Sequence, residues 1–181
     1  MKTVFFDIDT QIDFMYPAGA LYVPGAERIV PAVAELNRRA PFVISTMCAH
    51  AEDDPEFKMF PHHCVVDTFG QRKPAATLIE RCEPPRQVFL EKQKLNCFSN
   101  PRFEELLSEI GAERCIVYGV VTEICVRLAA FGLLKTGRRV EIVTDAVQGL
   151  DEEAVRRMFT EFSGSGGHLT TRSAILTGSF S

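Results

Sequence analysis

The sequence predicts a three-layer α/β/α domain of Rossmann-like type, in which helices cover both faces of a central parallel sheet of about six strands. Short apolar runs rich in β-branched and aromatic residues alternate along the chain with longer segments of helical spacing. These runs are almost continuously apolar, as are strands buried on both faces of a parallel sheet. The length of 181 residues suits one folding unit, so we expect residues 1–181 to form a single domain.

Each predicted strand is short and is bounded by charged residues, Gly or Pro. In chain order the strands cover residues 4–8, 42–46, 88–90, 115–118, 140–143 and 169–171. Helical spacing predicts helices over residues 27–39, 103–110, 123–135 and 151–162. Pro31 falls in the first turn of the first helix, where a missing N–H costs least, and Asp151 caps the last one. Residues 48–72 follow neither spacing, and such long connections are usually functional or mobile.

Composition excludes several classes of protein. With 46% hydrophobic and 24% charged residues, the chain is neither disordered, collagen-like nor a coiled coil. A net charge of −4 argues against nucleic-acid binding. Apolar runs fall short of the ~18–20 residues that span a bilayer, and the strand-like start predicts no secretory signal peptide. Because six scattered cysteines suit a reducing compartment, we expect a cytoplasmic protein.

The first candidate motif is a group of carboxylates at the end of the first strand. In an open parallel sheet the site lies at the carboxyl ends of the strands. Asp7 and Asp9 form an Asp-x-Asp pair there, as in haloacid-dehalogenase-type phosphatases, but Gln11 stands where that motif has Thr or Val. The later acidic pair is also missing, because Asp145 is followed by Ala146. The alternative interpretation is that Asp7 or Asp9 caps the strand and solvates the turn.

A thiol and an amine follow two other strands. Cys125 opens a helix, where the helix dipole and backbone N–H groups lower the pKa of a thiol and can form an oxyanion hole. Alternatively, Cys125 is a small buried hydrophobic residue. Lys92 follows the strand at 88–90 and can stabilise a thiolate, although lysines in such places are commonly just solvated. We expect three other cysteines to be structural: Cys82, Cys97 and Cys115.

Over about residues 3–150 the chain resembles the nicotinamidase/isochorismatase-like cysteine hydrolase superfamily. The resemblance lies in DTQIDF at residues 9–14, in Lys92 followed by Asn-Cys-Phe where Ser-Ala-Phe is usual, in the nucleophile loop at 119–126, and in Asp145-Ala146. It implies the isochorismatase-like hydrolase fold with strand order 3-2-1-4-5-6. It also implies a homodimer or homotetramer.

The resemblance implies a role for each matching residue: Asp9 as general base, Lys92 as its electrostatic partner and Cys125 as nucleophile. The expected reaction is hydrolysis of the C–N bond of a small amide, nicotinamide or a similar compound, through a thioester. Two alternatives stay open at this point. One is hydrolysis of a carbamoyl, ureido or maleamate-type amide without a metal. The other is a ligand-binding member of the fold without catalysis.

The resemblance also implies the surroundings of the nucleophile. The peptide bond between Val120 and Val121 is expected to be cis, and the N–H groups of Val121 and Cys125 to form the oxyanion hole. Phe14 and Val120 would line the substrate pocket.

A divalent metal is the cofactor that the resemblance suggests. Nicotinamidases carry Asp-x-His and a later His as metal ligands, and this chain has Cys48, His50 and His63 at those places. Cysteine is an acceptable zinc ligand, so a Cys/His/His zinc site is possible chemically. The alternative is that the metal site is lost and that His50 is a polar pocket residue.

Overall fold

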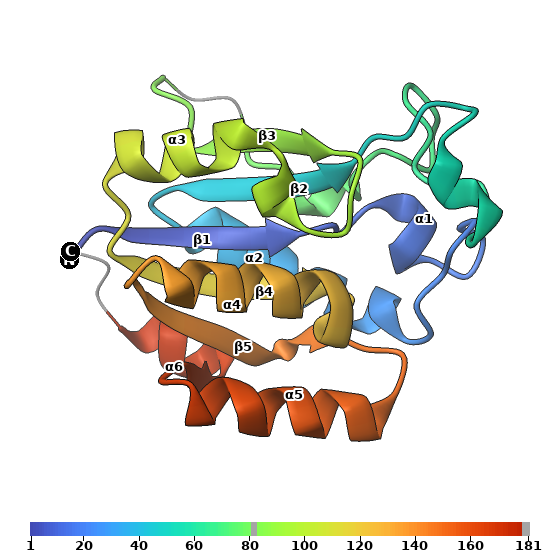
Figure 1. Ribbon diagram of the computed structural model, residues 1–181. Helices are drawn as coiled ribbons and strands as arrows, with labels where there is room; N and C mark the ends of the chain where they lie inside the picture. Colours follow the sequence, from blue (N-terminus) through green and yellow to red (C-terminus); the bar gives the residue numbers. More distant parts are fainter. Residues whose placement is uncertain (81–82, 179–181) are drawn as a thin grey trace.

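A computed structural model describes residues 1–80 and 83–178 and contains a six-stranded parallel sheet in the order β3-β2-β1-β4-β5-β6 (Figure 1). The strands are β1 Thr3–Ile8, β2 Val43–Cys48, β3 Gln87–Lys92, β4 Arg114–Val120, β5 Arg139–Gln148 and β6 His168–Thr170. Every neighbouring pair runs parallel. The predicted fold class and strand order are both confirmed. Cys82 lies outside the described residues.

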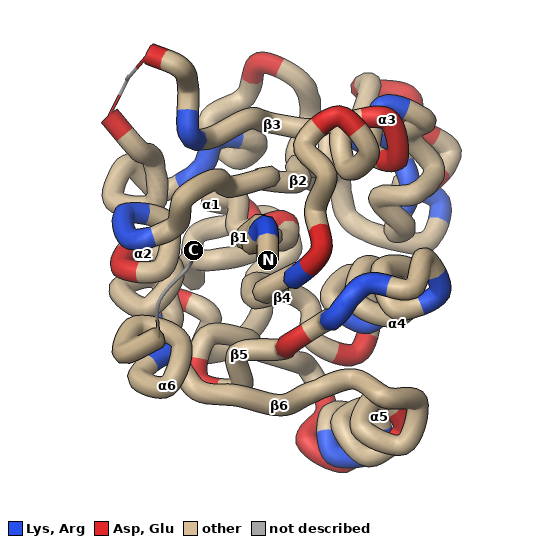
Figure 2. The backbone as a smooth tube through the Cα atoms, turned by 90° about the vertical axis from the view of Figure 1, so that its left-hand side faces the viewer, with Lys and Arg blue, Asp and Glu red and all other residues tan. Residues whose placement is uncertain are grey.

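Helices cover both faces of this sheet. The helices are α1 Ile12–Met15, α2 Val30–Arg39, α3 Pro101–Ile110, α4 Arg127–Lys135, α5 Glu152–Gly164 and α6 Arg172–Thr177. Viewed end-on, α2 and α6 lie on one side of the sheet and α3, α4 and α5 on the other (Figure 2). The three predicted layers are therefore present.

Two predicted helices begin differently from the prediction. The segment expected to be helical over 27–39 starts as a 3₁₀ turn, Ala26–Ile29, before α2. The segment expected over 123–135 starts as a π-helical turn, Thr122–Val126, before α4. Helix α6 was not predicted, since six residues carry too little periodicity to be recognised.

The core is built around β1, whose six residues are all buried. Its aromatic side chains Phe5 and Phe6 contact Tyr118 on β4 and Phe103 on α3, one on each face of the sheet. Burying side chains of this size stabilises a fold by roughly 1.5–3 kcal/mol each. Asp7 is the one charged residue of β1, and it is fully buried as well.

The carboxyl ends of β1, β2 and β3 point toward α1 and a long connection between β2 and β3 (Figure 1). This connection contains only two short 3₁₀ turns, Pro55–Lys58 and Ala75–Thr77, in its described part. It therefore has the irregular character predicted for residues 48–72. Among the described residues, no helix combines the length and the apolar character needed to cross a membrane.

Glu141 on β5 provides a test of the sheet's electrostatics. Its carboxylate accepts bonds from Arg114 on β4 at 2.7 and 3.1 Å and from Arg139 at 2.8 Å. Burial alone would raise the pKa of Glu141, but the two guanidinium groups hold it below its ordinary value. The ion pairs of Glu141 with the two arginines therefore stabilise the fold at pH values above the ordinary pKa of Glu. This stabilisation is lost as the pH falls through the lowered pKa of Glu141.

We expect Glu141→Gln to lower the free energy of unfolding at pH 7 by about 2 kcal/mol. The difference from wild type should shrink on acidification below about pH 5. Urea unfolding at several pH values measures both effects. Arg139→Gln, which removes the half-exposed partner, should cost less than about 1 kcal/mol. A constant difference between wild type and Glu141→Gln down to acid pH would contradict this account.

Candidate active site

Three of the predicted residues meet at the carboxyl edge of the sheet. Asp9 directly follows β1, Lys92 is the last residue of β3, and Cys125 lies in the π-helical turn after β4. Lys92 Nζ lies 2.8 Å from Asp9 Oδ2. The charges of Asp9 and Lys92 both act on the Cys125 thiol, which places the three groups close together. All three side chains are buried, and Cys125 is the most exposed of them at 8%.

Asp9 is held from several sides. Its backbone has φ = +51°, in the left-handed region that few non-glycine residues adopt. The Thr46 hydroxyl donates to Asp9 Oδ1 at 2.6 Å, and the Asp9 N–H donates to the carbonyl of Thr46 at 3.2 Å. With Lys92 on Oδ2, both carboxylate oxygens have partners. The orientation of the Asp9 carboxylate is therefore set by the ends of β2 and β3.

Lys92 contacts the thiol of Cys48 as well as the carboxylate of Asp9. Its Nζ lies 3.2 Å from Cys48 Sγ, and that sulfur lies 3.9 Å from Asp9 Oδ2. Burial would lower the pKa of Lys92, but the negative charge of Asp9 and its hydrogen bond to Lys92 outweigh this effect, and the pKa is raised well above its ordinary value. Lys92 is therefore an ammonium ion inside the site.

The surroundings of Cys125 raise the pKa of its thiol, whereas its place at a helix start predicted a lowered pKa. Burial raises the pKa of the Cys125 thiol well above its ordinary value. Lys92 lowers this pKa, while the negative charge of Asp9 raises it further. The effect of desolvation on the pKa of Cys125 is thus larger than the lowering expected from the start of a helix. The thiol can lose its proton only to a neighbouring acceptor, and Asp9 is that neighbour.

A cavity connects these groups with other predicted residues. The peptide bond between Val120 and Val121 is cis. The predicted residues that line the cavity are Asp9, Phe14, Cys48, His63, Val120, Val121 and Cys125. The prediction did not include the others: Leu21, Tyr22, Val23, Glu56, Phe60, Leu95, Ile124 and Leu150. Most of the added residues are apolar and come from loops, whose packing cannot be read from periodicity.

The charged groups of the cavity wall are acidic. Asp9 and Glu56 line it, whereas no lysine or arginine does so among residues 1–80 and 83–178. Burial lowers the pKa of His63, against the opposing effect of its bond to Pro61, so the His63 imidazole is neutral near pH 7. Lys92 stands behind Asp9 with its side chain fully buried.

The Asp-x-Asp pair does not form a shared carboxylate site. Asp7 has its own lysine, with Lys73 Nζ 2.8 Å from Asp7 Oδ2 and both side chains buried. Asp7 is also absent from the residues that line the cavity. The phosphatase interpretation, which needs both carboxylates at one site, therefore fails. The idea that Asp7 is a solvated strand cap is equally wrong, because Asp7 is fully buried.

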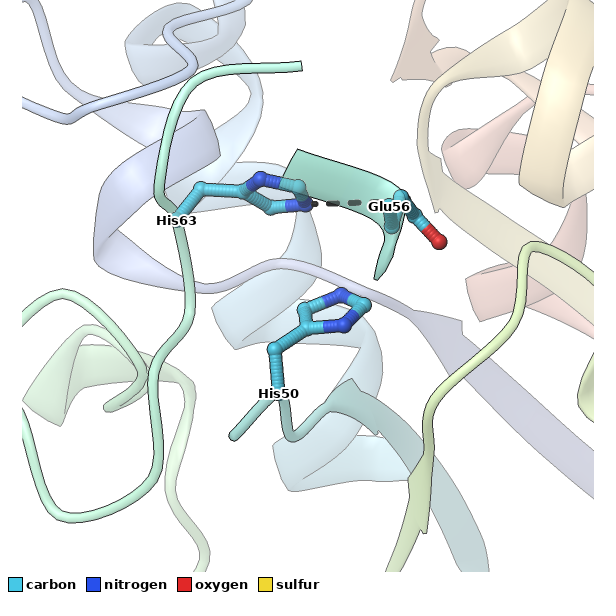
Figure 3. Close-up of side chains that lie close together, drawn as sticks. All are labelled: His50, Glu56 and His63. Atoms are coloured by element: carbon cyan, nitrogen blue, oxygen red, sulfur yellow. Dashed lines mark ion pairs between the residues drawn. The ribbon is translucent and has the colours of Figure 1, made fainter. Parts of the chain in front are cut away.

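A second group of ligand-type side chains lies close together (Figure 3), and two of its members, Glu56 and His63, line the cavity. One ligand atom from each of His50, Glu56 and His63 can be chosen so that all three lie within 4.8 Å of one another. Glu56 Oε1 is 3.9 Å from His63 Nε2. In the described part of the chain, no hydrogen-bond partner pairs with the buried Nε2 of His50.

The partners of the two histidines define where their protons are. His50 Nδ1 lies 2.9 Å from a carboxylate oxygen of Asp54, and His63 Nδ1 lies 2.7 Å from the carbonyl oxygen of Pro61. A carbonyl oxygen only accepts, and an ionised carboxylate does the same, so each Nδ1 carries the proton. In the neutral form of each imidazole, Nε2 then presents a lone pair. Outer partners of this kind orient metal-binding histidines in other proteins.

Glu56, and not Cys48, accompanies the two predicted histidines. Cys48 is the last residue of β2, and its sulfur contacts Lys92 and Asp9 instead. Burial raises the pKa of Cys48 to about 12, so its thiol keeps its proton. Position in a motif suggested Cys48 but does not reveal the direction of its side chain. Glu56 lies two residues after Asp54, whose carboxylate accepts the Glu56 N–H at 2.9 Å. An Asp followed by Pro and Glu is a sequence signal for a capped helical turn, and this signal could have drawn attention to Glu56.

Asp13 hydrogen-bonds two loops next to the site, the one that contains Ala20 and the one that contains Cys64. Its carboxylate accepts the N–H of Cys64 at 2.7 Å and the N–H of Ala20 at 3.0 Å. Gly70 packs so closely on Asp13 that a Cβ at this position would overlap the carboxylate. The acidic residue of the opening motif therefore anchors the long connection that carries His63.

Comparison with known proteins points to one family. A family model described as the isochorismatase domain matches residues 3–174. The probable hydrolase YcaC of Escherichia coli (strain K12) is 31% identical over 102 residues, which are 56% of this chain and 49% of that protein. The match thus spans about half the length of this curated relative.

Solved structures match over nearly the whole chain. The pyrazinamidase of Pyrococcus horikoshii in complex with zinc has a TM-score of 0.85 and 29% identity, over 94% of this chain and 99% of that chain. The pyrazinamidase/nicotinamidase of Streptococcus mutans UA159 has a TM-score of 0.86 and 25% identity, over 93% and 100%. PnC1 of L. infantum in complex with nicotinate has a TM-score of 0.85 and 26% identity, over 96% and 94%.

The Asp13 anchor makes a prediction about stability. In Asp13→Asn an amide N–H₂ would face one of the two backbone N–H groups, so one buried donor loses its acceptor. We expect the free energy of unfolding to fall by about 1–3 kcal/mol. Limited proteolysis should cut the connection between β2 and β3 faster. Asp53→Asn, at an exposed position of the same connection, is the matched control and should leave both unchanged. Equal behaviour of the two variants would show that Asp13 is not an anchor.

Proposed function

The chain belongs to the isochorismatase domain family, and from this we propose that it is a cysteine-dependent amidohydrolase that cleaves the C–N bond of a small amide. The family is one of hydrolases, so the broad class of reaction follows from membership. The amide substrate, the thioester intermediate and the roles of individual residues are our proposal. Nicotinamide is the first substrate to test.

One observation carries the proposal. A thiol and a carboxylate from two strand ends line one cavity, and an ammonium group from a third strand end lies next to the carboxylate, with 2.8 Å between Lys92 Nζ and Asp9 Oδ2. A nucleophile next to a base that a third group orients is the arrangement that covalent catalysis requires. This arrangement also argues against a ligand-binding protein without catalysis, which would have no use for the full triad.

The first half of the proposed reaction forms a thioester. Asp9 takes the proton of the Cys125 thiol, and the sulfur attacks the amide carbonyl carbon. The oxygen of the tetrahedral intermediate is stabilised by the backbone N–H groups of Val121 and Cys125. The C–N bond then breaks, and the leaving nitrogen takes the proton from Asp9, so ammonia departs. Lys92 keeps the Asp9 carboxylate in place and is close enough to stabilise the thiolate as it forms.

The second half returns the enzyme to its starting state. A water molecule gives a proton to Asp9 as its oxygen attacks the thioester carbon. The C–S bond breaks, the Cys125 sulfur takes the proton back from Asp9, and the carboxylic acid leaves. The raised pKa of Cys125 favours this return, because the thiol form is the stable one in the buried site.

The charge of the cavity indicates the class of amide. A substrate carboxylate would meet Asp9 and Glu56 in a wall without lysine or arginine among the described residues. In a metal-free site this disfavours maleamate-type substrates, because a buried carboxylate without a partner is costly. Uncharged amides fit better. These include nicotinamide as well as the carbamoyl and ureido compounds of the alternative hypothesis.

The residues present fit a divalent metal such as zinc. His50, Glu56 and His63 would hold it, and the buried His50 Nε2 without a partner supports this. Two histidines and one carboxylate are a known ligand set of catalytic zinc sites. When bound, the ion would supply a Lewis acid for a lone pair of the substrate, such as a pyridine nitrogen. Asp54 and Pro61 orient the two imidazoles for this role.

We expect the wild-type protein to release ammonia from nicotinamide. Cys125→Ala should lower the rate by at least about a thousandfold, because the group that forms the thioester is gone. A coupled ammonia assay measures both. Cys115→Ala is the matched control, since Cys115 is a buried thiol of β4 that does not line the cavity, and its activity should stay near wild type.

The outcomes separate the parts of the proposal. Activity that survives Cys125→Ala would refute the thioester mechanism for any substrate. If wild type releases no ammonia from nicotinamide but does so from a carbamoyl or ureido compound, the mechanism stands and the substrate changes. Faster turnover of maleamate than of nicotinamide would contradict the argument from charge.

We expect the protein to bind added zinc once a chelator and dialysis have removed any metal that it already carries. Glu56→Gln should weaken binding by at least about tenfold, whereas Cys48→Ser should leave it unchanged. Calorimetric titration with zinc measures the affinities, and elemental analysis gives the metal content of freshly purified protein. If Cys48→Ser weakens binding and Glu56→Gln does not, the ligand set is Cys48, His50 and His63. If wild type takes up no zinc, the site is not a metal site.

A further inference from the structure

A second buried lysine–aspartate pair lies next to the first, and the mechanism above does not use it. Lys73 Nζ is 2.8 Å from Asp7 Oδ2, and both side chains are at most 1% exposed. Lys73 comes from the connection between β2 and β3, and Asp7 from the centre of the sheet. Burying two charges costs free energy that only good geometry and further hydrogen bonds offset, so such a pair calls for a reason.

The Asp7 carboxylate is fully bonded by its neighbours. Oδ2 accepts the amide N–H of Asn37 at 2.9 Å and the hydroxyl of Ser45 at 3.2 Å, in addition to Lys73. Oδ1 accepts the hydroxyl of Thr10 at 2.6 Å. These donors come from α2, β2 and the turn after β1. The carboxylate is therefore a rigid, buried acceptor beneath that turn.

Thr10 connects this pair to the site. Its hydroxyl donates to Asp7 and accepts a hydrogen bond from Lys73 Nζ, and Thr10 is fully buried. Thr10 directly follows Asp9, whose backbone is left-handed at φ = +51°. A residue in that region keeps its conformation only when its surroundings impose it. Thr10 is thus bonded to the second lysine–aspartate pair, whereas Asp9 itself is bonded to Lys92.

We propose that Asp7 and Lys73, acting through the Thr10 hydroxyl, are positioning residues that hold the Asp9 carboxylate against Cys125. The proposal rests on the proposed function, because it assigns these residues a role through Asp9 as base. It concerns neither substrate nor metal. A misplacement of the order of 1 Å in a catalytic group can cost about a hundredfold in rate, so a turn with an unusual backbone benefits from a second set of bonds.

The test measures the reactivity of Cys125 without any substrate of the enzyme. Iodoacetamide alkylates a thiol that has lost its proton, so the rate at Cys125 reports whether Asp9 stands in place to accept that proton. Peptide mapping by mass spectrometry isolates Cys125 from the other five cysteines. We expect Thr10→Val to slow alkylation at Cys125 by at least about tenfold, and Thr10→Ser, which keeps the hydroxyl, to stay within about twofold of wild type.

Two controls distinguish positioning from loss of stability. Glu141→Gln also removes a buried, hydrogen-bonded carboxylate, but Glu141 lies near the amino ends of β4 and β5, away from the carboxyl edge that carries the site, and the variant should alkylate at the wild-type rate. Lys73→Met removes the ammonium and should slow alkylation as Thr10→Val does. If Lys73→Met does not fold, the Thr10 pair decides, because both charges stay in place in those variants.

The outcomes keep this inference apart from the proposed function. Asp9→Asn should slow alkylation at least as much as Thr10→Val, because the thiol then has no proton acceptor beside it; we expect this loss to outweigh the removal of the negative charge, which alone would lower the pKa of Cys125. If Asp9→Asn reacts like wild type, Asp9 is not the base and the proposed mechanism fails. If Asp9→Asn is slow but Thr10→Val melts at a lower temperature and still reacts at the wild-type rate, the Asp7 network is structural only. The positioning inference is then wrong while the mechanism stands.

Discussion

Two carboxylates two residues apart at the end of the central strand govern the active edge of the sheet. Neither Asp7 nor Asp9 can be buried unless an opposite charge is buried with it. Lys92 reaches Asp9 from the end of β3, across β2, and Lys73 reaches Asp7 from the long connection. The position of β3 relative to β1, and the path of the connection that carries the histidines, both satisfy this requirement for charge balance.

The two ion pairs serve different purposes because the chain turns between them. In a regular strand, residues 7 and 9 would face the same side of the sheet. The left-handed backbone at Asp9 ends this alternation, so Asp9 lines the cavity while Asp7 stays among α2 and β2. One carboxylate is thereby available to a nucleophile, and the other is completely enclosed. Under the proposed function, Asp9 would take part in the chemistry, whereas Asp7 would act only through the residues that it holds in place.

Sequence patterns predicted what depends on short-range regularity. Apolar runs located all six strands, and the parallel sheet placed Asp9, Lys92 and Cys125 at one edge. Lys73 contacts Thr10, which lies 63 positions earlier in the sequence, because of the path that the loop takes. No periodicity in the sequence predicts that path. The third member of the histidine group was missed for a similar reason. A motif gives the positions of candidate ligands, but the packing of a loop decides which side chains face one another.

The raised pKa of Cys125 also bears on how the protein withstands oxidants. Peroxide attacks thiolates, and a thiol whose pKa is raised by burial holds very little thiolate at neutral pH. The neighbouring thiols Cys48 and Cys97 have pKa values of about 12 and are similarly unreactive. Under the proposed mechanism, a reactive sulfur would exist only while Asp9 holds the proton of Cys125. Burial would then protect the thiol from oxidation between turnovers, at the expense of a nucleophile that is always ionised.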